Sequence, residues 1–299
     1  MEISTIIINY KSEGFLENCL KSLQKNLDGL SFEIIIVNNG SENLKLLEKI
    51  SKKYNAKLIN SEKNIGFGAA CNLGTEDAIG RFLFFINPDT EIISLFGKTL
   101  NDIKILKVDI CGGNLINLSG KPQEFSCGSF FTLKTLFFNK IINKSYNARL
   151  KPRSLDRGIW AGSSLKASIS AYPDRKVGVV DKPWLDKFPI EVDWVSGGAM
   201  IIKKDLFKKL NGFDKEYFMY LEDQDLCHRA RKMGFNIKFL PDFLIKHHKD
   251  PTMNKSKLVS YNKSLKRYFK KYNNFIENIS LTIIKPIYDF IKYGQNLKS

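Results

Sequence analysis

Short apolar segments and amphipathic segments alternate along the first third of the chain. Two β-branched runs, Glu2–Asn9 and Phe32–Asn39, each end in polar residues, as buried strands commonly do. Between them, the segment Glu13–Leu27 has helical spacing of its apolar residues, which are Phe15, Leu16, Cys19, Leu20 and Leu23. The order strand, helix, strand predicts a βαβ unit.

The same alternation continues to residue 86. The pattern predicts a helix around Leu44, Leu47 and Ile50, a strand over Ala56–Ile59, a helix over 68–79 and an apolar strand over Arg81–Ile86. Strands that alternate with helices indicate a mostly parallel sheet covered by helices on both faces. Ligands of such sheets bind beyond the carboxyl ends of the strands, so we expect the functional residues there.

The second half of the chain is less regular. The stretch 109–187 mixes Gly, Ser, Pro and aromatic residues, which is typical of long loops that shape a pocket. Further on, the pattern predicts a strand over Met200–Ile202, helices over Lys204–Leu210 and Asp223–Met233, and a strand over Ile237–Leu240 that ends at Pro241. A final amphipathic helix is indicated by Leu258, Tyr261, Leu265, Tyr268 and Phe269.

The composition narrows the class of protein. Hydrophobic residues make up 43% and charged residues 26% of the 299 residues, as in folded globular chains. The five cysteines lack metal-type spacing, and their odd number argues against a disulfide framework, so we expect a reducing, cytoplasmic location. No signal peptide is expected, and no segment reaches the about 20 apolar residues of a membrane-spanning helix.

The net charge of +16 indicates an anionic partner, and nucleic acid, a sugar nucleotide and anionic lipid all qualify. Residues 246–299 hold over half of the excess, with 12 Lys and Arg against 3 Asp and Glu. Two interpretations of this tail stay open: an amphipathic helix on an anionic membrane surface, or a helix packed on the domain with its lysines in water. A second apolar stretch follows at Ile279, Ile283, Ile284, Ile287 and Phe290.

A first candidate for chemistry is the segment Asn87–Thr90, which directly follows the predicted strand Arg81–Ile86. Pro88 forces an extended or turn conformation on the residue before it. The carboxylate of Asp89 is therefore suited to hold a divalent cation against a diphosphate. The alternative is an ordinary loop, because Asn-Pro-Asp is a common turn signal.

A second candidate is the acidic run Glu222–Asp225, which opens a predicted helix. Three carboxylates in four residues repel one another, so their burial would need a cation, a role as base or the helix dipole. The alternative is an exposed helix start, where acidic residues are favoured.

A third candidate is Asn64–Asn72, where small residues lead from a loop into a helix. Glycine there permits close approach of a ligand and frees amide donors for an anion. The spacing is not GxGxxG and no Walker lysine follows, which excludes dinucleotide-binding and P-loop proteins.

Taken in order, these segments resemble family-two glycosyltransferases, and within them the rhamnosyltransferase-like bacterial branch that builds surface polysaccharides. The likeness covers most of the chain: Ile6–Tyr10, Val37–Ser41, Asn64–Asn72 and Asn87–Asp89 are similar to the family's first strand, second-strand turn, Asn-x-Gly-Phe segment and reduced DXD. The most specific match is the run Trp194–Ala199, then Gly212, Phe213, Asp214, Tyr220, Glu222–Leu226 and Arg229. The resemblance implies a GT-A fold of the α/β class, with a Rossmann-like, mostly parallel central sheet flanked by helices and a C-terminal helical extension.

The resemblance also implies an organisation and a set of site residues. Residues 1–105 would form a nucleotide-sugar-binding half, 106–250 an acceptor-binding and catalytic half, and 251–299 basic amphipathic helices. The implied donor-binding residues are Asn9, Tyr10, Asn38, Asn64, Gly66, Asn72, Asn87, Asp89 and Lys255. Those implied for the acceptor or sugar pocket are Trp194, Gly197 and Gly198.

Two positions depart from the family pattern. Asn38 stands where members usually carry an aspartate that reads the pyrimidine base, and an amide can still donate and accept hydrogen bonds. Asn87 replaces the first aspartate of the DXD motif, which leaves Asp89 as the principal ligand of Mg²⁺ or Mn²⁺. His248 is a further candidate metal ligand, although histidines are more often structural.

By resemblance, Asp223 accepts the proton of the acceptor hydroxyl while that oxygen displaces the nucleoside diphosphate with inversion, and Glu222 is the second candidate base. The expected donor is a dTDP-rhamnose-like or UDP-hexose nucleotide sugar. The expected acceptor is a saccharide or lipid-linked saccharide, which would bring the enzyme to the inner face of the cell membrane in polysaccharide synthesis.

Three other functions are weighed against this one. A sugar-phosphate nucleotidyltransferase would show a Gly-rich phosphate loop near its N-terminus, and Ile6–Gly14 shows none. A basic nucleic-acid-binding protein would interleave stacking aromatics with its charges, and the tail offers little beyond Tyr268 and Tyr272, so no nucleic acid is expected as a partner. A catalytically silent carbohydrate-binding relative is the third.

Overall fold

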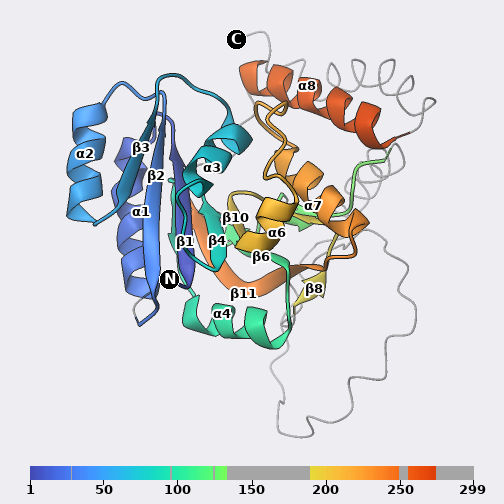
Figure 1. Ribbon diagram of the computed structural model, residues 1–299, viewed down its shortest axis with the longest axis horizontal. Helices are drawn as coiled ribbons and strands as arrows, with labels where there is room; N and C mark the ends of the chain where they lie inside the picture. Colours follow the sequence, from blue (N-terminus) through green and yellow to red (C-terminus); the bar gives the residue numbers. More distant parts are fainter. Residues whose placement is uncertain (28, 95, 124, 133–188, 249–254, 274–299) are drawn as a thin grey trace, which may run out of the picture.

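The computed structural model describes residues 1–27, 29–94, 96–123, 125–132, 189–248 and 255–273. The first elements alternate as the pattern predicts (Figure 1). They are β1 (Ile3–Asn9), α1 (Glu13–Asn26), β2 (Phe32–Asn39), α2 (Leu44–Lys53), β3 (Lys57–Ser61), α3 (Phe67–Thr75) and β4 (Phe82–Ile86). Each of the strands and helices predicted for residues 1–86 is therefore confirmed, with ends that differ by a few residues.

The later elements include several that the pattern does not reveal. They are β5 (Thr90–Ile92), α4 (Phe96–Ile105), β6 (Ile110–Ile116), β7 (Cys127–Gly128), β8 (Ile190–Glu191), β9 (Trp194–Val195), β10 (Ala199–Lys203), α6 (Lys204–Lys209), α7 (Glu222–Lys232), β11 (Ile237–His247) and α8 (Lys255–Tyr272). Most of the stretch expected to form pocket loops, 133–188, lies outside the described residues.

A nine-stranded mixed sheet forms the centre of the fold, in the order β3-β2-β1-β4-β10-β6-β11-β5, with β8 beside β11. Strands β1 to β4 are parallel to one another, whereas β10 runs antiparallel to both β4 and β6. The predicted α/β class and helix-flanked sheet are confirmed. Strands from distant parts of the chain are neighbours in this sheet, since β5 pairs with the last residues of β11.

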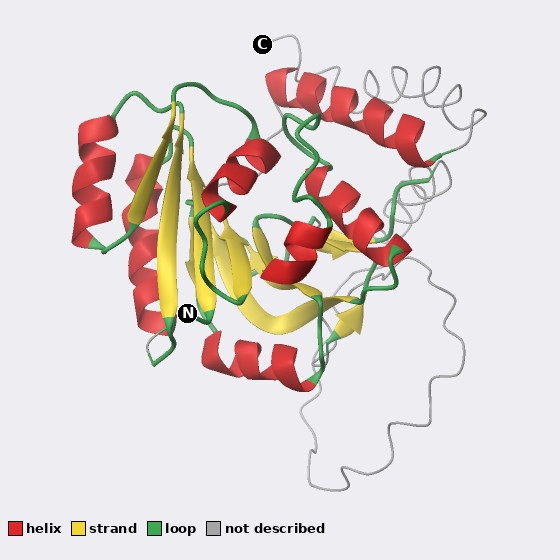
Figure 2. Ribbon diagram, viewed as in Figure 1, coloured by secondary structure: helices red, strands yellow, loops and turns green. Residues whose placement is uncertain are grey.

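Helices cover both faces of the sheet (Figure 2). Side chains alternate between the faces along β1: Ile3 and Ile7 pack with α1 and α4 residues such as Leu20 and Leu100, whereas Ile6 packs with residues of α3, α6 and α7. This alternation follows from the two-residue period of a strand. The double covering explains why the strands read as continuous apolar runs.

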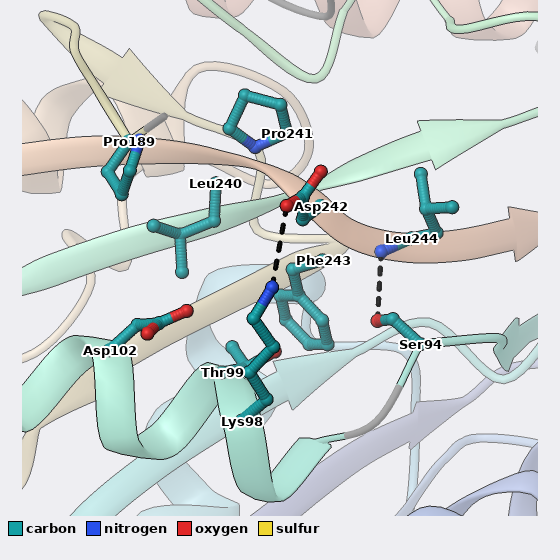
Figure 3. A pocket seen from close by; sticks show the side chains of 10 residues that line it. All are labelled: Ser94, Lys98, Thr99, Asp102, Pro189, Leu240, Pro241, Asp242, Phe243 and Leu244. Carbon is teal, nitrogen blue, oxygen red and sulfur yellow. Dashed lines mark hydrogen bonds and ion pairs between the residues drawn. The ribbon is translucent and has the colours of Figure 1, made fainter. Parts of the chain in front are cut away.

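The strand predicted to end at Pro241 does not end there. β11 continues to His247, and its register against β6 shifts between Leu240 and Leu244. A β-bulge accommodates the proline, which cannot donate a ladder hydrogen bond, and Asn114 Nδ2 donates to the Pro241 carbonyl at 3.2 Å. A pocket of about 290 Å³ lies against this bulge, between α4 and β11 (Figure 3).

The apolar stripe of the C-terminal helix α8 is packed on the domain. Leu258, Leu265, Tyr268 and Phe269 are all buried, which is the second of the two interpretations of this stripe. The other apolar stretch of the tail, 279–290, lies outside the described residues. Within the part that the structure describes, no helix has the length and hydropathy to cross a bilayer.

Candidate active site

Polar residues at the carboxyl ends of β1 and β2 form one buried hydrogen-bonded cluster. Asn9 Nδ2 donates to Ser41 Oγ at 3.2 Å and to Glu13 Oε1 at 3.0 Å. Asn38 Oδ1 accepts from the Ser41 amide at 2.9 Å, and its Nδ2 donates to Asn60 Oδ1 at 3.3 Å. Asn9 and Asn38 therefore lie together at the edge of the sheet where α/β proteins bind ligands.

The loop before α3 is fixed by Asn39, a residue that the sequence reasoning did not single out. Asn39 Nδ2 donates to Asn64 Oδ1 at 3.1 Å, and its Oδ1 accepts from the Ile65 amide at 3.0 Å. The Gly66 amide donates to Asn64 Oδ1 at 2.9 Å. Asn64 and Gly66 are thus tied to Asn39, the neighbour of Asn38 at the end of β2.

Gly66 begins α3 with a φ of 89°, a backbone conformation that favours glycine. A Cβ at this position would overlap the Phe218 carbonyl, which accepts from the Phe67 amide at 3.0 Å. The amides of Ile65, Gly66 and Phe67 are therefore all engaged within the protein. These contacts hold the loop in place, and the three amides are not available to a diphosphate in this conformation.

The acidic residue after β4 meets a histidine at the end of β11. His247 Nε2 lies 3.2 Å from Asp89 Oδ1, and His247 Nδ1 lies 2.9 Å from Gln123 Oε1. The predicted metal ligand His248 instead places Nε2 at 2.7 Å from Glu91 Oε1, while its amide donates to the Asp89 carbonyl at 2.8 Å. The side chains of Asp89 and His247 are both largely buried, so the contact between them is shielded from solvent.

Neighbouring residues of a strand point to opposite faces, so the choice between His247 and His248 depends on the phase of β11. The bulge after Leu240 inserts extra residues and changes that phase. If the strand is expected to end at Pro241, the face on which each histidine lies cannot be predicted. The pair His247-His248 is visible in the sequence, but nothing in the sequence tells which of the two faces Asp89, and the choice of His248 as metal ligand does not foresee this contact of His247.

The second acidic segment is buried at the start of α7. Asp223 Oδ2 accepts from the Gly197 amide at 3.0 Å, and Oδ1 accepts from the Gln224 amide at 2.8 Å. Asp223 is partly buried, whereas Glu222 is buried and its Oε2 has no hydrogen-bond partner among the described residues. The exposed acidic helix start considered above is therefore wrong for these two residues.

Burial raises the pKa of Asp223 above the ordinary value of 3.8, against the opposing effect of the Gly197 and Gln224 amides. Burial also raises the pKa of Glu222, and repulsion from Asp223 raises it further. A carboxylate with a raised pKa is a stronger base than an exposed one. Of the two, Asp223 is the carboxylate whose oxygens are both held by backbone amides, which fixes its position for accepting a proton.

Contacts through the backbone connect the two acidic segments. The Asn87 amide donates to the Gly198 carbonyl at 3.1 Å, and a Cβ on Gly198 would lie 3.0 Å from Asn87 Nδ2. The amide of Gly197, the preceding residue, donates to Asp223 Oδ2. The segment that leads into β10 therefore joins Asn87 and Asp89 on one side to Asp223 on the other.

The remaining site candidates take different positions. Tyr10 is 42% exposed at the rim. Asn72 accepts from the Phe213 amide and donates to the Phe213 carbonyl, both at 2.8 Å, so it ties α3 to the loop before α7. Trp194 is buried, and its indole N–H donates to the Ser129 carbonyl at 3.0 Å. Lys255 is the first residue of α8, and its side chain lies outside the described part of the structure.

The pocket of Figure 3 contains none of these candidate residues. It is lined by Ser94, Lys98, Thr99, Asp102, Pro189, Leu240, Pro241, Asp242, Phe243 and Leu244. The ion pair between Lys98 Nζ and Asp242 Oδ2 spans 3.6 Å and is exposed. The candidate active site is therefore defined by its hydrogen-bonded side chains rather than by this pocket.

The order of the strands and the polar residues gathered at their carboxyl ends agree with the GT-A fold expected from the sequence. The family model described as glycosyl transferase family 2 matches residues 4–166, and the model described as the N-terminal domain of galactosyltransferase matches residues 185–253. The chain belongs to glycosyl transferase family 2, and it is a hexosyl- or rhamnosyltransferase.

Two relatives are similar to this chain over most of their length. The N-acetylglucosaminyl-diphospho-decaprenol L-rhamnosyltransferase of Mycobacterium tuberculosis (strain ATCC 25618 / H37Rv) is 36% identical over 260 residues, which are 83% of this chain and 76% of the relative. Rhamnosyltransferase WbbL of Escherichia coli (strain K12) is 27% identical over 256 residues, 81% of this chain and 82% of WbbL.

Solved structures with low identity show the same fold. GalNAc-T7 with UDP, GalNAc and Mn²⁺ superimposes with a TM-score of 0.57 at 13% identity, over 90% of this chain and 48% of that chain. S. aureus TarS in complex with UDP gives a TM-score of 0.51 at 19% identity, over 90% of this chain and 72% of that chain. The predicted GT-A fold is thus confirmed, and neither the nucleotidyltransferase nor the nucleic-acid-binding alternative is favoured.

Proposed function

We propose that Asp223 is the base of an inverting transfer at this rim. Its carboxylate takes the proton from the acceptor hydroxyl as that oxygen bonds to the anomeric carbon, and the bond from that carbon to the nucleoside diphosphate breaks. The observation that carries the proposal is a pair of hydrogen bonds: the amide of Asn87, two residues before Asp89, donates to the Gly198 carbonyl, and the amide of the adjacent Gly197 donates to Asp223. It brings a candidate diphosphate-binding carboxylate and a candidate base to one rim, as a single displacement requires.

Asp89 and His247 are the proposed metal-binding residues. One carboxylate oxygen and one imidazole nitrogen that already face each other at 3.2 Å suit Mn²⁺ or Mg²⁺, whose remaining positions are commonly filled by substrate phosphates and water. No group of three or more His, Cys, Asp or Glu side chains that could hold a metal occurs within the described ranges, so the protein contributes few ligands. A bound cation would neutralise the charge that develops on the leaving diphosphate.

The cluster around Asn9, Asn38 and Asn64 is proposed to bind the nucleoside. Amide side chains at these strand ends offer both donors and acceptors, so recognition of the base would use paired hydrogen bonds. We retain 1–105 as the proposed donor half, 106–250 as the acceptor and catalytic half and 251–299 as the basic extension, although β strands of the first two halves share one sheet.

The proposed donor is a dTDP-rhamnose-like or UDP-hexose sugar, and the proposed acceptor is a saccharide or lipid-linked saccharide. Support comes from the M. tuberculosis relative, whose name states transfer to a diphospho-decaprenol-linked sugar. A lipid-linked acceptor would place the enzyme on the inner membrane face. Lys263, Lys266 and Lys270 form an exposed row on α8, away from its buried stripe, and could meet anionic lipid there.

A panel of nucleotide sugars, incubated with and without Mn²⁺ and Mg²⁺, tests the proposal through release of free nucleoside diphosphate. We expect hydrolysis of one donor class to depend on the metal in the wild type and to lose that dependence in His247→Ala. Equal hydrolysis by wild type with and without metal would remove Asp89 and His247 from the proposed role. Release of a nucleoside monophosphate and sugar 1-phosphate, which means cleavage within the diphosphate instead of at the anomeric carbon, would refute sugar transfer altogether.

A further inference from the structure

Two consecutive non-glycine residues directly before α7 adopt a left-handed backbone. Tyr220 has a φ of 70° and Leu221 a φ of 67°. This conformation is unfavourable for residues that carry a Cβ and persists only where surrounding contacts enforce it. Leu221 is the N-cap of α7, whose first residues are Glu222 and Asp223. The position of Asp223 therefore depends on what holds this turn.

The contacts that hold the turn come from α8. Ser264 Oγ donates to the Met219 carbonyl at 2.8 Å, and the Tyr261 ring meets the Tyr220 ring edge-on at 6.0 Å. Leu221 is buried in a small apolar cluster, whose other fully buried members are Tyr217, Leu265, Tyr268 and Phe269. Three of these four belong to α8, so the turn is buried mainly by that helix.

Residues of α8 also bind Asp225, which lies in the first turn of α7. This carboxylate is fully buried and accepts from Lys271 Nζ at 2.6 Å, Tyr272 Oη at 2.7 Å and Arg229 Nε at 2.8 Å. The Tyr272 ring also stacks on His228 of α7, with ring centres 3.8 Å apart. In Figure 1, α8 crosses above α7 and the preceding loop, in agreement with these contacts.

We propose that α8 is a clamp for the catalytic helix, with Lys271 and Tyr272 as its positioning residues. They hold Asp225, and through it the first turn of α7, so that the strained turn cannot relax and Asp223 stays against the Gly197 amide. The inference rests on the proposed role of Asp223 as base. Loosening the clamp would slow the chemical step, while the strand-end residues that are proposed to bind the donor would remain in place.

Kinetics of full-length Lys271→Met and Tyr272→Phe, with Lys208→Met as control, test the clamp. Lys208 is an exposed residue of α6, outside the proposed site and the lysine row of α8, and its replacement removes the same charge, whereas Tyr272→Phe removes one hydroxyl and keeps the stacked ring. We expect kcat to fall about tenfold or more in both variants, with donor KM and the dissociation constant for nucleoside diphosphate unchanged within twofold. Lys271→Arg, which keeps the cation, should recover most of the loss.

Turnover is expressed per folded protein, from circular dichroism at the assay temperature. The clamp is overturned if both variants match Lys208→Met, or if their donor affinity falls in step with kcat, which would indicate general loosening. Asp223→Asn separates the two levels of the proposal. Normal turnover in Asp223→Asn refutes the base, whereas slow Asp223→Asn with normal Lys271→Met and Tyr272→Phe refutes only the clamp.

Discussion

Replacement of Asp223 by asparagine removes the proposed base with little change in shape. The wild-type carboxylate accepts from two amides, those of Gly197 and Gln224. Asparagine keeps one acceptor oxygen and turns its NH₂ toward the other amide, so one hydrogen bond to a charged acceptor is lost. That loss costs about 1.5 to 3 kcal/mol, but the variant no longer buries a charge. We expect the free energy of unfolding to change by at most about 2 kcal/mol, because the two effects oppose each other.

The effect on catalysis should be much larger. A positioned base contributes about 10² to 10⁴ in rate, which corresponds to about 3 to 5 kcal/mol of barrier. Initial rates at saturating donor and acceptor measure it, with calorimetry of nucleoside diphosphate binding as the test of an intact donor site. The matched control is Glu222→Gln, also isosteric and buried. Glu222→Gln keeps the proposed base, so its kcat should stay within about tenfold of wild type.

A variant Asp223→Asn that turns over within tenfold of wild type would refute the reasoning. If Glu222→Gln is then the slow variant, the base is Glu222. If both are slow and both lose diphosphate affinity, the acidic segment supports the donor site and is not the base.

Three further predictions concern other parts of the site. Asp89→Ala and His247→Ala should each weaken nucleoside diphosphate binding in the presence of Mn²⁺ and leave metal-free binding unchanged; equal affinities with metal in calorimetry would contradict the metal assignment. Gly197→Ala should lower kcat, because its Cβ would lie 2.9 Å from Phe67 Cε1 and 3.6 Å from Asp223 Cβ. Wild-type rates would show that the surrounding side chains move to admit the methyl group without disturbing Asp223. Burial would raise the pKa of Asp214, but hydrogen bonds from Lys271, the amide of Glu216 and Arg267 outweigh it and lower the pKa from 3.8 to about 2. A lowered folded-state pKa stabilises the protein above pH 4 and loses this contribution as the pH falls toward 2. Urea unfolding from pH 5 to 2 should therefore show a weaker pH dependence in Asp214→Asn, and identical curves would contradict the ion-pair assignment.

Local patterning determines much of the first half of this fold. The strands β1, β2 and β4 are buried on both faces, so their apolar runs are unbroken and bounded by polar residues. The fold class and the acidic segment of α7 follow from such patterns together with the family resemblance. By contrast, β5 and β6 are defined by pairing with β11, a contact between distant residues that no local period records.

The site details that could not be predicted share this non-local origin. His247 and not His248 faces Asp89 because of a bulge whose effect depends on the partner strand β6. The left-handed residues Tyr220 and Leu221 carry no turn signature, since glycine or asparagine would be expected there. Their conformation is imposed by α8, whose basic sequence gives no sign of what its buried face contacts.

The position of β10 has a consequence for the order in which the chain can assemble. This strand lies between β4 and β6, yet it is made more than a hundred residues after β4. Until residue 203 has emerged from the ribosome, the apolar strand β4 has no partner on one edge and presents open backbone groups. Such edges recruit other chains. A fragment that stops after residue 105 should therefore aggregate where the whole chain folds, and synthesis past β10 is the step that protects it.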